Sequence, residues 1–314
     1  MTQPRSQQVS LLDTPYYHCV SRCVRRAFLC GNDERTGVCY EHRRQWIVDR
    51  MRLLSSIFTL DICAYAVMNN HYHLVVKIDS SKQFSNQEVI QRWLTLYKGP
   101  LLVQRFAQGE TLDQAECKTV DDIVTVWRNR LQDLSWFMKC LNEPIARMAN
   151  QEDNCTGHFW ESRFKCQPLL SEEALLSCMA YVDLNPVRAG MADTPEDSEF
   201  TSVQERIKPK FDAEAAIRLQ QDNQYLNEFN LALKPLLHFD KTIKNETQNG
   251  IPFPFSDYLK LVDWTGRAIR NDKRGHIPSN LPPILQRLNI PIDRWLVNSQ
   301  HFEKIVYRQF RKIA

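Results

Sequence analysis

Apolar and polar residues alternate along parts of this chain in a way that predicts β-strands. The first predicted strand covers residues 16–23, and the second is the apolar run 64–78, with a partner strand expected around residues 60–63. Successive side chains of a strand point to opposite faces, so His71 and His73 project from the same face. The other face is apolar and is expected to meet a core: Tyr72, Leu74, Val76 and Ile78. One strand therefore combines a core-facing surface with two histidines close enough to share a metal ion.

Apolar residues repeat at helical spacing in three further stretches. They predict helices over residues 40–58, 87–97 and 121–150, and Pro144 is expected to kink or end the third. The third helix carries a single apolar stripe: Ile123, Trp127, Leu131, Leu134 and Met138. The residues between the second and third helices show no clear period, so a looser stretch is expected there.

A last strand and a last helix are expected after residue 156. Residues 157–166 are predicted to form the strand, and the helix covers residues 171–185. Ser171 is placed to cap this helix, and two glutamates follow in its first turn. Pro186 is expected to close the helix, because the residue before a proline avoids helical geometry.

The order of these elements indicates an α+β protein. A ferredoxin-like antiparallel sheet backed by helices is the simplest match, with residues 79–150 as a helical insertion. Composition changes near residue 200, because the first 200 residues are slightly acidic and the remainder is basic. The basic C-terminal part is expected to be mostly helical, and its charge fits either nucleic-acid binding or an ordinary solvated helical surface.

Bulk composition is that of an ordinary globular protein. The chain has 314 residues, of which 43% are hydrophobic, and a formal net charge of +3. No apolar run approaches the roughly 18 residues that cross a bilayer, and the first residues lack the apolar segment of a signal peptide. We therefore expect a cytoplasmic protein without membrane contact. The ten cysteines form no C-x-x-C pair, so they are expected to be reduced thiols rather than zinc ligands.

The histidine pair gains chemical meaning from the last predicted helix. Tyr181 and Asn185 are spaced i, i+4 and share a helix face. If that face meets the histidine strand, Asn185 can complete a metal site with His71 and His73, and Tyr181 lies about one helical turn away. This is the arrangement expected for a tyrosine that attacks a metal-polarised phosphate. Mg²⁺ or Mn²⁺ fits such a site better than Zn²⁺, because open, oxygen-favouring positions are needed.

Each part of this constellation also has a structural explanation. Two alternating histidines can simply be hydrogen-bonded at a sheet surface, and Tyr181 and Asn185 can be a buried tyrosine and a helix-capping asparagine. A zinc hydrolase acting on small substrates is a further alternative, but no third His, Asp or Glu lies at a spacing that supports it. The combination of both motifs on facing elements favours phosphoryl transfer.

Two segments resemble a known family. Residues 70–76, Asn-His-Tyr-His-Leu-Val-Val, resemble the histidine-hydrophobic-histidine (HUH) motif of single-tyrosine transposases. Residues 159–164 and 180–190 resemble the second half of that domain. Taken together, residues 13–205 are most similar to the REP-associated tyrosine transposases, and residues 206–314 have no counterpart that we can match.

The resemblance implies a function and a set of roles. His71, His73 and Asn185 would hold the metal, and Tyr181 would be the nucleophile that forms a 5′-phosphotyrosine with single-stranded DNA. The expected activity is a DNA transposase or endonuclease that cuts and rejoins single-stranded DNA containing a hairpin. The alternative is a domesticated, non-catalytic protein that binds repeated palindromes. The resemblance leaves open whether the chain acts as a monomer or a homodimer.

Basic residues are further candidates for DNA contact, because guanidinium and ammonium groups bind phosphates. One group lies near the predicted sheet: Arg22, Arg25, Arg26 and Arg163. A second group lies in the C-terminal region: Arg267, Arg270, Lys273 and Arg274. Residues 301–314 interleave basic and aromatic side chains, which suits single strands but also a packed amphipathic helix.

Overall fold

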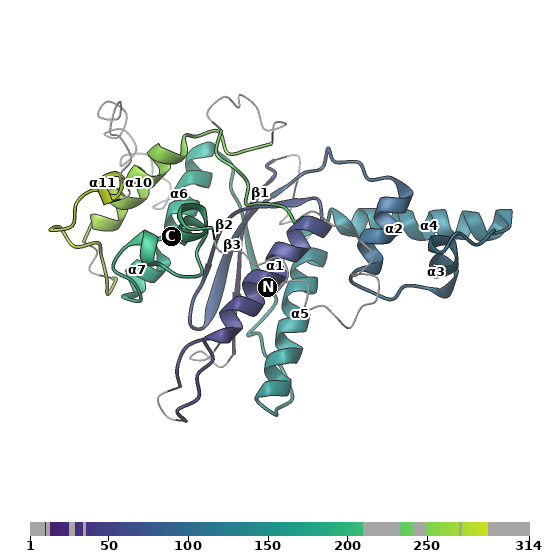
Figure 1. Ribbon diagram of the computed structural model, residues 1–314, viewed down its shortest axis with the longest axis horizontal. Helices are drawn as coiled ribbons and strands as arrows, with labels where there is room; N and C mark the ends of the chain where they lie inside the picture. Colours follow the sequence, from purple (N-terminus) through teal and green to yellow (C-terminus); the bar gives the residue numbers. More distant parts are fainter. Residues whose placement is uncertain are drawn as a thin grey trace.

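A four-stranded antiparallel sheet forms the centre of the computed structural model, which describes residues 10, 13–24, 29–33, 36–209, 233–240, 249–269 and 272–287. The strands are β1 (Tyr16–Arg22), β2 (Leu60–Val67), β3 (His71–Ile78) and β4 (Lys165–Pro168). Their order in the sheet is β2-β3-β1-β4, so β3 and β1 are central (Figure 1). The α+β class and the antiparallel sheet backed by helices are thereby confirmed.

The apolar run 64–78 is two strands and not one. Its first residues belong to β2, whereas residues 68–70 form the turn of a hairpin whose second strand is β3. The Met68 amide donates to the His71 carbonyl across this turn at 2.8 Å. Asn69 and Asn70 explain the break, because asparagine favours turn conformations over strands. The partner strand expected at residues 60–63 therefore extends to Val67.

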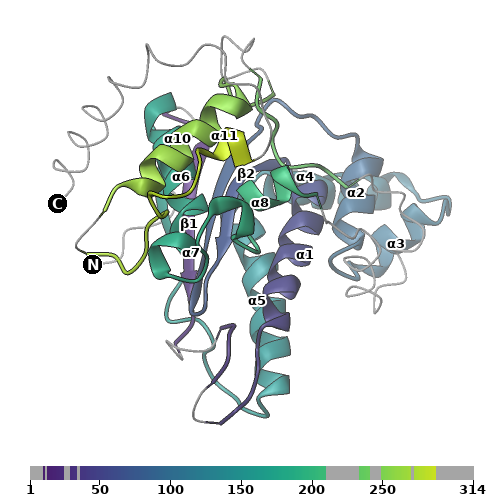
Figure 2. The same cartoon turned by 60° about the vertical axis from the view of Figure 1, so that its left-hand side comes forward.

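One face of the sheet packs against α1 (His42–Ile57) and α5 (Leu134–Glu152), which lie alongside each other in both views (Figures 1 and 2). The β3 residues predicted to face the core are buried in an apolar cluster that also contains residues of α1 and α5: Tyr72, Leu74, Val76 and Ile78. Three more helices form a lobe at one end of the sheet: α2 (Asn86–Leu94), α3 (Leu101–Ala107) and α4 (Gln114–Leu131). Helix α3 occupies the stretch expected to be loose.

The prediction of a single helix over residues 121–150 is wrong, because two helices occupy this stretch. Helix α4 ends at Leu131, and α5 starts after Asp133, whose carboxylate accepts a hydrogen bond from the Trp136 amide at 3.0 Å. Pro144 lies inside α5 and does not end it. A proline cannot bond to the carbonyl four residues earlier, which here is that of Cys140. Arg50 Nε donates to this carbonyl at 2.9 Å and so satisfies it.

The contact between Arg50 and Cys140 gives a stability prediction. We expect Arg50→Met to lower the free energy of unfolding by about 1–3 kcal/mol, because a buried carbonyl loses its donor. The matched control is Pro144→Ala, which supplies a backbone N–H for the same carbonyl. In the Pro144→Ala background, Arg50→Met should cost measurably less in urea denaturation. Equal costs in both backgrounds would contradict this role of Arg50.

The opposite face of the sheet is covered by α6 (Glu172–Asp183), with α10 (Phe255–Arg267) packed behind it (Figure 2). Ser171 caps α6 as predicted, accepting from the Ala174 amide at 3.2 Å. The helix ends at Asp183, and Pro186 lies in the first turn of a separate short helix, α7 (Asn185–Ala189). Proline is accepted there because the first amides of a helix need no intrahelical partner.

The last strand is shorter and later than expected. Only residues 165–168 pair with β1, whereas Trp160 makes an isolated bridge to Cys23. Residues 157–164 otherwise form bends and irregular backbone, in which the Phe159 carbonyl accepts from the Val24 amide at 2.9 Å and the Glu161 amide donates to the Arg22 carbonyl at 2.8 Å. The Trp160 indole donates to the Asn142 carbonyl at 2.9 Å. The strand predicted over residues 157–166 is thus reduced to β4 and to a short bridge around Trp160.

The C-terminal residues share a core with the sheet domain. Leu237, Ile251 and Tyr258 are buried in the same apolar cluster as Leu175 and Met179 of α6. The remaining short helices lie near this part: η2 (Pro195–Asp197), α8 (Ser202–Ile207) and α11 (Ile284–Arg287). A boundary near residue 205 stays a prediction. Within the described residues, no helix has the length and apolarity needed to cross a membrane.

Candidate functional site

His71 and His73 lie on the face of β3 that meets α6. Their ring centroids are 4.8 Å apart, and the Nε2 atoms of the two rings are separated by 3.0 Å. His73 is buried, whereas His71 is half-buried at the start of the strand. The alternation of the strand thus directs two ring nitrogens to one point.

A third histidine, His18, completes this cluster and was missed by the sequence reasoning. Its Nε2 lies 3.0 Å from Nδ1 of His73, and the two rings are stacked with centroids 5.2 Å apart. Strand β1 pairs with β3 so that Val20 is opposite His73, which makes His18 the diagonal neighbour on the same face. Alternation in β1 gives the face of His18, but only the pairing of β1 with β3 brings it to His73.

With the Asn70 amide oxygen facing His71, the contacts assign one proton position to each ring. The Asn70 side-chain oxygen can only accept, so His71 Nδ1 donates to it at 2.5 Å and His71 Nε2 keeps its lone pair. His73 Nε2 therefore donates to His71 Nε2, and His18 Nε2 donates to His73 Nδ1. Each imidazole carries one proton in this chain of contacts.

All three rings are neutral near pH 7. Burial lowers the pKa of His18 to about 4. Burial and the charge of Arg22 lower the pKa of His71 to about 4. The pKa of His73 falls well below its usual value, through burial first and then through the neighbouring histidines, Arg22 and Lys273. Neutral imidazole is the form that binds metal ions.

These shifts predict a pH-dependent stability. The unfolded chain takes up protons on histidine near pH 6.5, whereas His18 and His71 stay neutral in the folded chain down to about pH 4. We expect the free energy of unfolding to be fully retained above pH 6.5 and to fall as the pH drops from 6.5 toward 4. Urea denaturation with EDTA, over this range, measures the slope. The slope should be smaller in His18→Gln, and an equal slope in both proteins would contradict the prediction.

Tyr181 lies on α6 beside the histidine cluster, with its side chain 40% exposed. Its ring meets His73 edge-on, with centroids 5.5 Å apart, and His18 at 6.4 Å. Asn185 starts α7, and its amide nitrogen donates to the Tyr181 carbonyl at 3.0 Å. The Tyr181 ring therefore lies next to the paired imidazoles of His71 and His73, and all three residues come from the same chain.

The spacing of the two histidine nitrogens is compatible with a divalent cation. Two nitrogens 3.0 Å apart match adjacent ligands of an octahedral ion with bonds of about 2.1 Å. Asn185, the third ligand predicted from the sequence, uses its Nδ2 to bind the Tyr181 carbonyl, and no hydrogen bond joins it to His71 or His73 among the described residues. A three-histidine zinc site does not form, because His73 turns its two nitrogens to different neighbours. No group of three His, Cys, Asp or Glu side chains suited to a metal occurs among the described residues.

The residues predicted to contact DNA differ in their exposure and in their neighbours. Arg22 is exposed and pairs across the sheet with His71, and Lys273 is close enough for its charge to affect His73. Arg163 is exposed before β4, and the Arg274 amide binds the Arg188 carbonyl at 3.2 Å.

Arg267 is engaged within the C-terminal part. It donates to the Asp263 carboxylate at 2.8 Å and to the carbonyls of Leu281 and Pro282. The remaining candidates lie outside the described residues: Arg25, Arg26, Arg270 and the segment 301–314.

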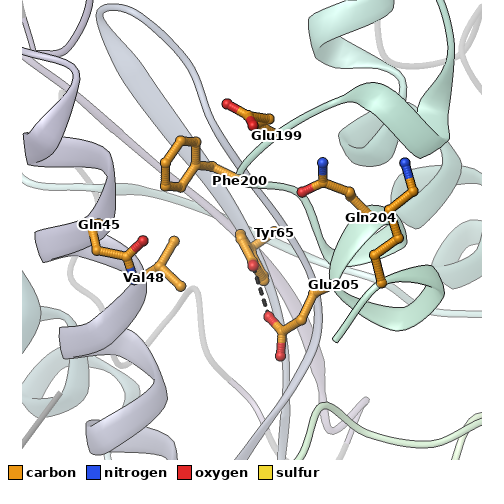
Figure 3. Close-up of a pocket in the computed structure, with 8 residues that line it drawn as sticks. Gln45, Val48, Tyr65, Glu199, Phe200, Gln204 and Glu205 are labelled. Carbon is orange, nitrogen blue, oxygen red and sulfur yellow. Dashed lines mark hydrogen bonds between the residues drawn. The ribbon is translucent and has the colours of Figure 1, made fainter. Parts of the chain in front are cut away.

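A separate cleft of about 130 Å³ lies between α1, β2 and α8. Figure 3 shows Tyr65 and Phe200 in it, with the Tyr65 hydroxyl donating to Glu205 at 2.7 Å. Glu199 also lines it. Carboxylates disfavour phosphate, and the cleft contains none of the histidines, so it is not part of the candidate site.

Comparisons with known proteins yield a structural likeness but no match in sequence. No family model matches this chain, and no curated protein matches it. Among solved structures, it is similar to a REP-associated tyrosine transposase bound to a REP hairpin, over 68% of this chain and 90% of that one. The identity is 11% and the TM-score 0.39, values too low for function to be transferred.

Proposed function

We propose that this chain cuts and rejoins single-stranded, hairpin-containing DNA through a tyrosine nucleophile. The supporting observation is the edge-on contact of Tyr181 with His73, whose Nε2 is 3.0 Å from that of His71. The ring that carries the proposed nucleophilic hydroxyl thus lies against one of the two neutral imidazoles proposed to hold a cation. This combination suits attack on a phosphodiester.

Each residue has a distinct role in the proposed reaction. Tyr181 Oη forms a bond to phosphorus, and the bond from phosphorus to the 3′ oxygen of the preceding nucleotide breaks. The 3′ oxygen takes up a proton from solvent, so the products are a 5′-phosphotyrosine and a free 3′-hydroxyl. The exposure of Tyr181 lets its proton leave to solvent. Because the covalent intermediate conserves the bond energy, attack by a 3′-hydroxyl reverses the step and reseals a strand.

His71 Nε2, His73 Nε2 and Asn185 Oδ1 are the atoms proposed to hold Mg²⁺ or Mn²⁺. When bound, such a cation polarises the phosphoryl oxygen and neutralises charge that develops during attack. Arg22 and Lys273 add positive charge close to the same point and are proposed to bind the phosphates that flank the cut. Tyr181 and His73 of one chain are in contact, so a complete site within a monomer is part of the proposal.

Labelled hairpin oligonucleotides test this function. The full chain is incubated with Mn²⁺ and a hairpin strand labelled at either its 3′ or its 5′ end, then separated in denaturing gels. A 3′-labelled strand should yield a covalent protein adduct, whereas a 5′-labelled strand should yield only a shorter free product. Tight hairpin binding with no adduct in Mg²⁺ or Mn²⁺ would overturn the proposal and favour a non-catalytic DNA-binding protein.

A further inference from the structure

His18 has no role in the proposed reaction, although it contacts the centre of the site. Its Nε2 is 3.0 Å from His73 Nδ1, its ring stacks on that of His73, and its edge approaches Tyr181. The side chain is half-buried between β1 and α6. An imidazole held by this hydrogen bond and by the ring contact with Tyr181 is well placed to restrain its neighbours.

We propose that His18 is a positioning residue for His73, a role that rests on the proposed metal-dependent function. By binding Nδ1 of His73, it holds the His73 ring with Nε2 turned toward His71. It also keeps the His73 ring against the edge of Tyr181. Histidine ligands commonly depend on such a hydrogen-bonded partner on their second nitrogen.

The geometry assigns His18 this indirect role because it cannot be a ligand of the same ion. The two nitrogens of the His73 ring point in different directions. Nε2 faces His71, so a cation held between these two residues lies on that side of the ring. His18 lies on the other side of the His73 ring, at Nδ1. When His73 Nε2 gives its lone pair to a cation, its proton is held at Nδ1 and is donated to His18 Nε2. Each ring still carries one proton, so His18 supports both states by switching from donor to acceptor.

The role of His18 in restraining His73 can be measured without metal. In full-length chain with ¹⁵N-labelled histidine and EDTA, two-bond ¹H–¹⁵N spectra report which nitrogen of His73 is protonated. The wild-type chain should show one tautomer, protonated at Nε2. His18→Leu should show a mixture of two, because a His73 ring without a partner at Nδ1 can rotate and break the bond of its Nε2 to His71. His18→Gln should retain the single tautomer, because its side-chain amide can reach the position of Nε2.

The consequence for metal binding is measured separately, by following free Mn²⁺ with electron paramagnetic resonance in the absence of DNA. His18→Leu should weaken Mn²⁺ binding about 10- to 100-fold. His18→Gln should restore binding to within about threefold. The matched control is His158→Leu, which replaces an exposed histidine outside the cluster and should change neither measurement.

The outcomes separate this inference from the proposed function. A single His73 tautomer and unchanged Mn²⁺ affinity in His18→Leu would overturn the role of His18. Loss of the single tautomer in His18→Leu, with no Mn²⁺ bound by the wild-type chain, would support the restraint of His73 by His18 and overturn the metal site. Weaker Mn²⁺ binding in His18→Leu without rescue in His18→Gln would also contradict a role through the hydrogen bond.

Discussion

Tyr181→Phe is expected to abolish formation of the covalent DNA adduct, with a loss of at least about a thousandfold. The substitution removes only the hydroxyl oxygen. The edge-on contacts of the ring with His73 and His18 remain, so the fold and the histidine cluster should be unchanged. The measurement is the rate of adduct formation with a 3′-labelled hairpin strand in Mn²⁺. Hairpin affinity, measured in parallel, should stay within about twofold, because binding depends on phosphate contacts made elsewhere.

The matched control for this substitution is Tyr40→Phe. Tyr40 is half-buried, and the Arg43 guanidinium lies over its ring, 4.1 Å from the ring centroid. Its loss of a hydroxyl should leave adduct formation unchanged. An adduct that persists in Tyr181→Phe would show that another side chain is the nucleophile. A parallel loss in both variants would indicate a general effect on folding.

The sheet could be predicted from the sequence because alternation sets the face of each strand residue. The burial of Tyr72, Leu74 and Val76 and the pairing of the His71 and His73 rings both follow from that rule. The ends of the helices could not be predicted in the same way. Local signals do not reveal that Arg50 satisfies the Cys140 carbonyl, which is why Pro144 is accepted in the middle of α5.

The site was only partly predictable because strand pairing is not encoded locally. The pattern in β1 places His18 and Val20 on one face, but which strand they meet depends on the register with β3. His18 therefore had no visible partner in the sequence. The C-terminal cations show a similar limit: Arg267 and Arg274 are close in sequence, yet the Arg267 side chain binds the Asp263 carboxylate, whereas the Arg274 backbone binds the Arg188 carbonyl.

Asp183→Ala is expected to cause the largest loss of stability. Asp183 is fully buried at the end of α6 and accepts hydrogen bonds from the Ser202 hydroxyl, the Val203 amide at 3.0 Å and the Tyr258 hydroxyl. It thereby joins the helix that carries Tyr181 to α8 and α10. Removing the carboxylate leaves three buried donors without an acceptor, at about 1–3 kcal/mol each. We expect the free energy of unfolding to fall by about 3–5 kcal/mol in urea denaturation followed by circular dichroism.

Two milder substitutions make the origin of this loss visible. Asp183→Asn keeps the shape and one acceptor oxygen, and burial already raises the pKa of Asp183 and so disfavours its charged form. It should therefore cost clearly less than Asp183→Ala. Tyr258→Phe removes one hydroxyl and should cost about 1 kcal/mol. In Asp183→Ala the Tyr258 hydroxyl has already lost its acceptor, so adding Tyr258→Phe should cost little or nothing more. Fully additive costs would show that Asp183 stabilises α6 independently of α10, and the C-terminal part would then not help to hold the Tyr181 helix in place.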